Sequence, residues 1–321
     1  MGMESESNIG EKMILGHMPL IGSSYQSKEK DRELVRRFSD RNEIRKIFET
    51  AYRHGIRKYA ASSSMMTKLS NLHIETVREY HEKGYEFEII PCFSIPIMLK
   101  NKKIDAFKRW ATYLEIEKQK TPAILNRVLN DPILNFREQW RKKLPEATAY
   151  PRNALKDLKI KWDRVEDALE EFSDLPVSYV EPGSETDFLA MTERYDLLGE
   201  LIDRITESGY ENILFGVHHA GETINRLDKE FEKFDGYVTP INSMGIMMLP
   251  THKSAEEAIK NTQKEVFVIK PFAGGRIEPS QAFKYILKFR TEGLMFGAST
   301  EEEIVEDINA YTVAHTEPHA R

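Results

Sequence analysis

Short apolar runs alternate with longer amphipathic segments along most of the 321-residue chain. Hydrophobic residues recur at helical spacing in the longer segments, many of which begin at Asn, Ser or Thr, the residues that cap helix N-termini well. The apolar runs have the length of buried strands, and they are KMILGHMPLIG, IRKYAASS, FEIIPCFSI, PVSYVEP, NILFGVHH, GYVTPIN, VFVIKPF and GLMFGAS. This alternation, repeated about eight times, predicts an α/β fold in which a parallel sheet closes into a (β/α)8 TIM barrel, as one domain over residues 1–321.

An open, doubly wound sheet is the other architecture that alternating strands and helices build. Such a sheet often carries a G-x-G-x-x-G turn between its first strand and first helix, where the glycines let a dinucleotide approach the backbone. The chain has no such motif at that place. The sequence therefore favours the closed barrel.

One connection is much longer than the others. Residues 97–175 separate the third predicted strand from the fourth, are mostly helical in pattern, and contain Trp110, Trp140 and Trp162. Residues 100–164 hold 17 Lys and Arg against 8 Asp and Glu, a net charge of +9, whereas the rest of the chain carries −15. Because the connection leaves the carboxyl end of a barrel strand, where barrel active sites lie, it predicts a basic lid over the site. A helical elaboration with a solvated basic surface is the alternative.

Composition narrows the class of partner. The formal net charge of −6 does not favour nucleic acid, and no RNA- or DNA-binding motif accompanies the basic connection. No apolar run approaches the roughly 20 residues of a membrane helix. The single cysteine, Cys92, excludes an internal disulfide framework and is typical of a reducing compartment. We therefore predict a soluble, cytoplasmic protein that binds a small anionic molecule.

Polar residues follow several predicted strands, at the rim where barrel active sites lie. The candidates for catalysis are His17 on the first strand, Glu181 on the fourth, His218 on the fifth and Lys270 on the seventh, all near the carboxyl ends. Neighbouring residues on a strand point to opposite faces, so only one of His218 and His219 is expected to face the mouth.

The same residues allow a metal hypothesis. Two histidines and a carboxylate bind a divalent metal with an open position for water, and His17, Glu181 and His218 are the predicted set. No metal-spaced motif such as H-E-x-x-H is present in the sequence. Histidines that are simply hydrogen-bonded at strand ends are the alternative interpretation.

Lys270 ends a buried strand and precedes a loop with glycines and an arginine, PFAGGRI. A lysine in a dry barrel mouth has a lowered pKa and serves as a Schiff-base nucleophile or general base; pairing with a phosphate and a purely structural role are the alternatives. The loops after strands seven and eight usually hold phosphate in barrels. The residues predicted to bind a phosphate or cofactor here and along the neighbouring rim are His219, Asn242, Gly274, Gly275, Arg276, Gly297 and Ser299. A tight turn would also explain the two adjacent glycines.

Five segments together resemble the aldo-keto reductase superfamily in order and spacing. They are KMILGHMPLIG, AYRHGIRKYAASS, NILFGVHHAGETINRL, VFVIKPFAGGRI and GLMFGASTEEEIVEDINA. The resemblance covers both ends of the chain and fades over residues 97–175. It implies a (β/α)8 barrel and a nicotinamide cofactor, NADP in particular.

The residues that carry the reductase mechanism are replaced. The resemblance places Ala60 at the family's aspartate, Met65 near its tyrosine and Glu181 near its histidine, and the third strand ends without the family's lysine. The Ser-Asn pair that holds the nicotinamide becomes His218-His219, and the aromatic residue that stacks on its ring becomes Ile241. Proton donation to a carbonyl needs an acid with a tuned pKa, so the family's mechanism does not transfer.

Three functional hypotheses follow. The first is an enzyme on an aldo-keto-reductase-like barrel that acts on a small anionic or phosphorylated substrate through the polar residues at the mouth. The second is an NAD(P)-dependent oxidoreductase in which His17, His218 or Lys270 replaces the tyrosine as proton donor. The third is a non-catalytic barrel that binds a nucleotide or a partner through its basic connection.

Overall fold

Eight parallel strands form the barrel in a computed structural model that describes residues 11–136 and 139–316. The strands are β1 (Met13–Leu15), β2 (Lys58–Ser62), β3 (Glu88–Phe93), β7 (Glu181–Pro182), β8 (Leu214–Gly216), β9 (Gly236–Pro240), β10 (Glu265–Ile269) and β11 (Gly293–Phe296). β1 pairs with β11. Between β7 and β8 a single bridge joins Val180 to Ile213, and the Leu214 N–H donates to the Val180 carbonyl at 2.9 Å. The closed barrel is therefore confirmed, and all eight strands lie in the predicted apolar runs.

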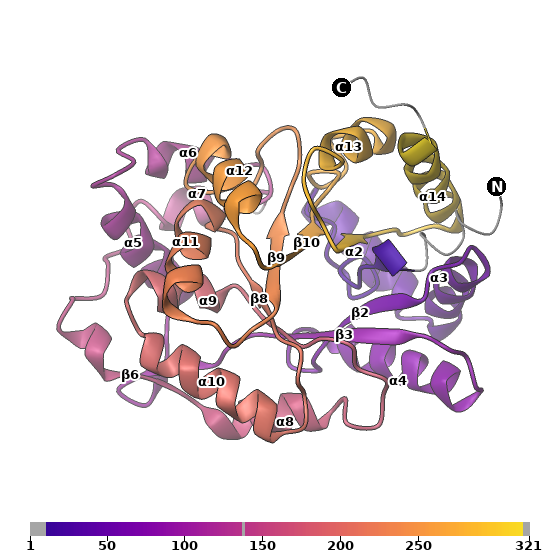
Figure 1. Ribbon diagram of the computed structural model, residues 1–321, viewed down its shortest axis with the longest axis horizontal. Coiled ribbons are helices and arrows are strands. Elements are labelled where there is room, and N and C mark those ends of the chain that lie inside the picture. The colour runs from indigo at the N-terminus through magenta and orange to yellow at the C-terminus, as the bar shows by residue number, and fades with distance from the viewer. Residues whose placement is uncertain (1–10, 137–138, 317–321) are drawn as a thin grey trace.

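Helices surround the strands, as Figure 1 shows. The outer ring contains α3 (Arg41–Arg53), α4 (Lys68–Glu82), α8 (Trp162–Glu170), α10 (Tyr195–Glu207), α11 (Ala220–Glu230), α12 (His252–Asn261), α13 (Pro279–Ile286) and α14 (Glu301–Thr316). The side chains of Asp40, Thr67 and Thr251 accept backbone hydrogen bonds at the starts of α3, α4 and α12, as N-caps do. Two further helices, α2 (Lys28–Phe38) and α9 (Glu185–Met191), follow strand ends. None of the described helices combines the length and the apolarity that crossing a bilayer requires.

Two apolar layers hold the barrel together. The larger layer lies between strands and helices, where Phe48 stacks on Tyr59 and Tyr80 at ring-centroid distances of 4.3 Å. The smaller one fills the barrel interior with Ile14, Ala60, Ile90, Leu214, Val238, Phe267 and Met295. Alternate strand residues point inward, so these side chains plug the barrel below its carboxyl rim. The polar residues at the strand ends therefore lie above an apolar floor.

The long connection after β3 contains more than the predicted helices. Its strands β4 (Ile97–Leu99), β5 (Lys102–Lys103) and β6 (Leu158–Ile160) form a small antiparallel sheet, which the helical pattern did not indicate. Its helices are α5 (Ala106–Glu117), α6 (Ile124–Asn130) and α7 (Gln139–Lys143), with a 3-10 turn over Ala154–Asp157. α8 belongs to the outer ring, and its Trp162 packs under the Arg204 guanidinium of α10 at 4.6 Å. The segment at the rim is thus shorter than 97–175, and Trp162 is not part of it.

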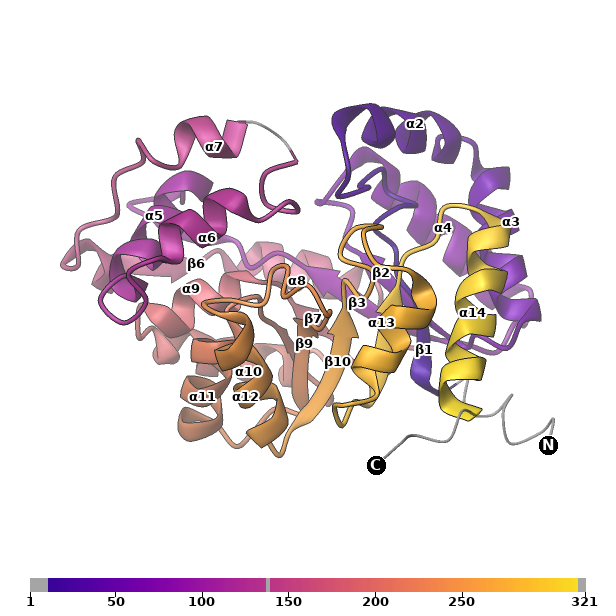
Figure 2. The same ribbon diagram turned by 90° about the horizontal axis from the view of Figure 1, so that it is seen from above.

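Two side chains fix this segment to the carboxyl rim. Arg127 donates to the carbonyls of Gly245 and Met248, at 2.8 and 2.9 Å, in the loop after β9. Asp131 accepts from the Met247 N–H at 2.7 Å. In Figure 2 helices α5–α7 stand on one side of the rim and α2 stands on the other. The segment therefore covers the loops after β8 and β9.

Replacing Asp131 should loosen this attachment. Its buried carboxylate also accepts the N–H groups of Ile133 and Leu134, so Asp131→Ala leaves three backbone donors without their partner. We expect a loss of about 1–3 kcal/mol in the free energy of unfolding and faster proteolysis within residues 97–160, measured by urea titration and limited digestion. Asp131→Asn keeps one acceptor oxygen and should lose less. Equal stability and digestion for all three proteins would contradict this role.

Candidate active site

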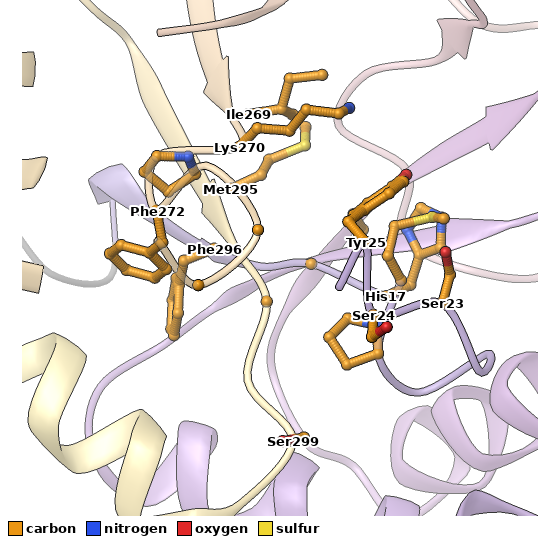
Figure 3. A pocket seen from close by; sticks show the side chains of 18 of the residues that line it. His17, Ser23, Ser24, Tyr25, Ile269, Lys270, Phe272, Met295, Phe296 and Ser299 are labelled. Carbon is orange, nitrogen blue, oxygen red and sulfur yellow. The ribbon is translucent and has the colours of Figure 1, made fainter. Parts of the chain in front are cut away.

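A cavity of about 600 Å³ opens at the carboxyl rim. The cavity is lined by residues at the ends of β1, β3, β7, β10 and β11, the loop at 16–26, His218, α2 and the start of α14. Figure 3 shows part of this lining, including His17, Tyr25 and Lys270. Within the described parts of the chain, residues 97–175 contribute nothing to this lining. Phe136 of the basic segment lies with its ring 6.2 Å from that of Tyr25, and Arg109 on α5 pairs with Glu185, which lines the cavity. The described part of the segment therefore borders the cavity, and its role as a lid stays a prediction.

Lys270 occupies the inner end of this cavity. It follows the last residue of β10 and has a φ of +54°, a conformation that L-residues seldom adopt. Its Nζ lies 3.1 Å from Nε2 of His218 and 5.1 Å from the centre of the Tyr25 ring. Figure 3 shows Lys270 and Tyr25 extending toward the same open space. No carboxylate among the described residues forms an ion pair with the Lys270 amine.

Burial controls the protonation of this pair. Desolvation lowers the pKa of Lys270 from 10.5 to about 8, although the charges of Glu181 and Cys92 act in the other direction. Burial, and next the nearby Lys270 charge, lower the pKa of His218 well below its usual value. The His218 ring is therefore neutral at physiological pH. Its backbone N–H donates to the Asp187 carboxylate at 2.8 Å, which fixes its position after β8.

Glu181 places a buried carboxyl group at the inner end of the cavity. It lies on β7, in register with Cys92 of β3. Desolvation raises its pKa from 4.5 to about 8, and the Lys270 charge and the Cys92 thiol offset only part of this shift. Most Glu181 side chains therefore carry a proton at pH 7. Gly216, at the end of β8, leaves room for this carboxyl group, because a Cβ there would lie 2.9 Å from Glu181 Oε1.

His17 contributes a buried imidazole without a hydrogen-bond partner among the described residues, and it lines the cavity. Burial, followed by the charges of His73 and Lys270, lowers its pKa from 6.5 to about 3. The ring centroids of His17 and His73 are 6.5 Å apart. Both nitrogens of this neutral ring are buried without a partner among the described residues, which is uncommon for buried polar groups.

The structure does not support the predicted metal site. His17, Glu181 and His218 line one cavity, yet nowhere in residues 11–136 and 139–316 do three His, Cys, Asp or Glu side chains form a group that could hold a metal ion. The amine of Lys270 bonds to His218, the position that a metal would need. The three residues lie near the carboxyl ends of their strands, but their side chains are not arranged to bind one metal ion.

Two of the predicted cofactor-binding residues have structural roles. His219 is buried, stacks on Tyr113 at 3.5 Å, and lies 3.4 Å from the Asp187 carboxylate through Nδ1. Asn242 is buried and exchanges hydrogen bonds with the backbone of Ile246. Neither residue lines the cavity. As strand alternation predicted, one histidine of the adjacent pair faces the mouth, and it is His218.

The predicted phosphate loop is formed only in part. Gly274 and Gly275 line the cavity with φ of +68° and +74°, conformations that favour glycine. The Arg276 guanidinium donates to the carbonyls of Tyr25, Ala273 and Gly274, so it holds the loops together and does not line the cavity.

The start of α14 is already bound to a carboxylate of the chain. Ser299 lines the cavity beside Gly297, but its N–H and hydroxyl both donate to Glu303, at 2.6 and 2.9 Å. Glu306 and Asp307 line the same end of the cavity. Figure 3 places Ser299 well away from Lys270. A phosphate at Ser299 would have to displace Glu303 and lie among carboxylates, which opposes the predicted phosphate site.

The residues present do not fit a nicotinamide dinucleotide. Of the three positions that would hold the nicotinamide, His218 is bonded to Lys270, His219 lies beneath Tyr113, and Ile241 is a fully buried aliphatic residue. The carboxylates at the start of α14 would face the phosphates of the cofactor. The NADP implied by the resemblance therefore has no matching site here.

Several residues of the site were not predicted. The sequence analysis assigned no role to Tyr25 and no helix to α2, which supplies Lys30 and Leu34 to the cavity. The stretch SKEKDRELVRRF has an N-cap, Ser27, and an amphipathic pattern that would have indicated the helix. Asp187, which receives both N–H groups of the histidine pair, has no sequence signal of its own.

Comparisons with known proteins bear on the fold. No protein-family model and no curated protein sequence matches the chain. A solved structure of a candidate aldo-keto reductase from Pseudomonas aeruginosa is similar, with 11% identity and a TM-score of 0.55 over 95% of this chain and 90% of that one. A second structure of a candidate aldo-keto reductase from that organism has 12% identity and a TM-score of 0.50, over 95% and 91%. At such identities the likeness shows the fold, an aldo-keto-reductase-like (β/α)8 barrel.

Because His17 is buried in its neutral form, we expect the free energy of unfolding to fall at acidic pH. Its pKa is about 3 in the folded protein and 6.5 as a model value, so between these values the unfolded chain binds the extra proton and stability falls as the pH falls. His17→Gln removes this contribution. From about pH 6 to about pH 4 the variant should gain about 1.4 kcal/mol per pH unit relative to the wild type, measured by urea unfolding. A difference that does not change with pH would show that His17 is not held neutral.

Binding measurements with NADPH and NADH test whether the cavity is unsuited to a nicotinamide dinucleotide. NADPH and NADH should not bind measurably at about 1 mM in isothermal titration calorimetry, which corresponds to less than about 4 kcal/mol of binding free energy. The double variant Glu303→Gln, Glu306→Gln removes two of the opposing charges and should bind no more weakly than the wild type. Micromolar binding of either cofactor by the wild type would overturn the conclusion.

Proposed function

We propose that the chain is an enzyme that carries out acid–base chemistry on a small, anionic carbonyl compound bound at the inner end of the cavity. The observation that carries this proposal is Lys270, a buried amine without an ion-pair partner, bonded to the neutral His218. Perturbed ionisable groups in a cleft are typical of active sites. The geometry supports this first hypothesis better than the nicotinamide hypothesis, because the dinucleotide has no matching site.

Each residue has a role that follows from its protonation. Glu181, with a pKa of about 8, holds a proton at neutral pH and acts as the general acid toward the carbonyl oxygen. Lys270, with a pKa of about 8, exists in both forms near neutrality and polarises or attacks the carbonyl. His218, neutral and bonded to the Lys270 amine, accepts its proton. His17 donates a hydrogen bond to the ligand from its free ring.

The charge at the inner end favours an anion. With Glu181 protonated and His17 and His218 neutral, the ammonium form of Lys270 has no compensating charge beside it. A ligand carboxylate supplies that charge in a region of low dielectric constant, where the attraction is strong. The carboxylates of Glu303 and Glu306 at the other end oppose a phosphorylated tail. The substrate class is therefore a short carbonyl compound with a carboxylate. The single, half-buried Cys92 accords with a reducing, cytoplasmic location.

Proton exchange next to the carbonyl tests the chemistry without knowledge of the natural substrate. In D₂O the protein should accelerate the exchange of the methyl protons of pyruvate, followed by proton NMR. Because a general acid or base contributes about 10²–10⁴-fold, Lys270→Met should remove at least about 10²-fold of the acceleration. The exposed Lys253→Met, on α12, is the matched control and should behave as the wild type.

Two comparisons make the outcome decisive. Exchange of 2-oxobutyrate should also be accelerated, and exchange of neutral hydroxyacetone should be accelerated much less, because it lacks the carboxylate. Saturable binding of the oxo acids without any exchange would indicate that the chain is a binding protein and not an enzyme. The absence of both binding and exchange would overturn the proposed function.

A further inference from the structure

Lys270 differs from the other lysines that the barrel places near its strands. Lys264, before β10, donates to the carbonyls of Glu232 and Phe234 at 3.0 and 2.7 Å. Lys12, before β1, pairs with Glu292 at 3.0 Å. These partners give Lys264 and Lys12 a structural role. The Lys270 amine has the imidazole of His218 and the ring of Tyr25 beside it and no ion-pair partner among the described residues, so stability gives no reason for its position.

We propose that the amine of Lys270 is the nucleophile of the enzyme and forms an imine with the carbonyl carbon of the substrate. This inference rests on the proposed function and adds a covalent step to it. The Lys270 side chain starts at the end of β10 and extends into the cavity, so an entering carbonyl compound reaches Nζ from the open side. The ring of Tyr25 and the apolar side chains of Ile269 and Met295 line the same space.

The surrounding residues supply what imine formation requires. A lysine becomes nucleophilic when desolvation favours its neutral amine, and burial has this effect on the Lys270 pKa. Nε2 of His218 lies at hydrogen-bond distance and accepts the proton that leaves the nitrogen. Glu181 holds the proton that the departing oxygen needs. An apolar floor disfavours the water that would reverse the reaction.

The step balances with these groups alone. The neutral Lys270 nitrogen attacks the carbonyl carbon, a C–N bond forms, and a proton passes from nitrogen through His218 to the oxygen to give the carbinolamine. Glu181 then donates its proton to the hydroxyl group, the C–O bond breaks and water leaves. The products are a protonated imine and the Glu181 carboxylate, which compensate each other's charge. No oxidant or reductant is consumed.

The protonated imine also explains the substrate class. Its positive nitrogen withdraws electrons from the neighbouring carbon, so a proton there is easily removed, or a C–C bond there is easily broken. A carboxylate next to the carbonyl lies beside this positive charge. The class of reaction is therefore proton transfer or carbon–carbon bond formation and cleavage next to the carbonyl of a 2-oxo acid.

Reductive trapping tests the inference on the wild-type protein. Incubation with pyruvate and sodium cyanoborohydride at about pH 8 should convert the imine to a stable secondary amine. Intact-mass measurement should show one added pyruvate-derived group, and peptide mapping should place it on Lys270. Lys253→Met should be labelled to the same extent as the wild type, whereas Lys270→Met should lose the specific label. Labelling only of exposed lysines, or none, would overturn the inference.

A second variant keeps the test independent of folding defects in Lys270→Met. Glu181→Gln keeps the nucleophile but removes the acid, so the rate of labelling at Lys270 should fall by about 10²-fold. An unchanged rate would exclude Glu181 from the step as written. Accelerated proton exchange without a trapped adduct would leave the proposed function standing and remove the imine. A trapped adduct on Lys270 without exchange would show that the amine is nucleophilic but would overturn the enzyme on which the inference rests.

Discussion

The parallel register of the eight strands is the constraint on which the site depends. Because every strand runs the same way and the bridge at Val180 closes the ring, β7, β8 and β10 end at one rim. Glu181, His218 and Lys270 meet there although they are distant in sequence. The apolar plug beneath them, with Phe267 and Met295, keeps the polar groups at the mouth. Side chains that would be ordinary on a surface therefore share one poorly hydrated space.

Desolvation then gives these residues their chemistry. Burial favours the neutral form of each group, so the pKa of Glu181 rises to about 8 while that of Lys270 falls to about 8. An acid that keeps its proton and an amine that gives up its proton thus coexist near neutral pH. The family that this barrel resembles in fold uses other residues at these strand ends. The scaffold is shared, and the chemistry of the mouth is that of this chain.

Much of this arrangement could be predicted from the sequence. Hydrophobic periodicity gives strands and helices directly, and alternation along a strand indicated that only one of His218 and His219 faces the cavity. Interactions between distant residues could not be predicted in this way. The Glu303 carboxylate accepts the hydrogen bond of the Ser299 N–H, and Arg276 donates to backbone carbonyls. No local sequence pattern predicts either interaction. The attachment of the long connection could not be predicted for a similar reason, since Asp131 and Arg127 bind backbone groups in the distant loop after β9.

Gly216 has an evolutionary consequence. A methyl group at this position would press on an oxygen of Glu181 and on the backbone of β7, so any larger residue there must be accompanied by a shift of the acid. The two positions, on separate strands, therefore constrain each other's substitution. A larger side chain on β8 at this point and a new acid on β7 must therefore arise together.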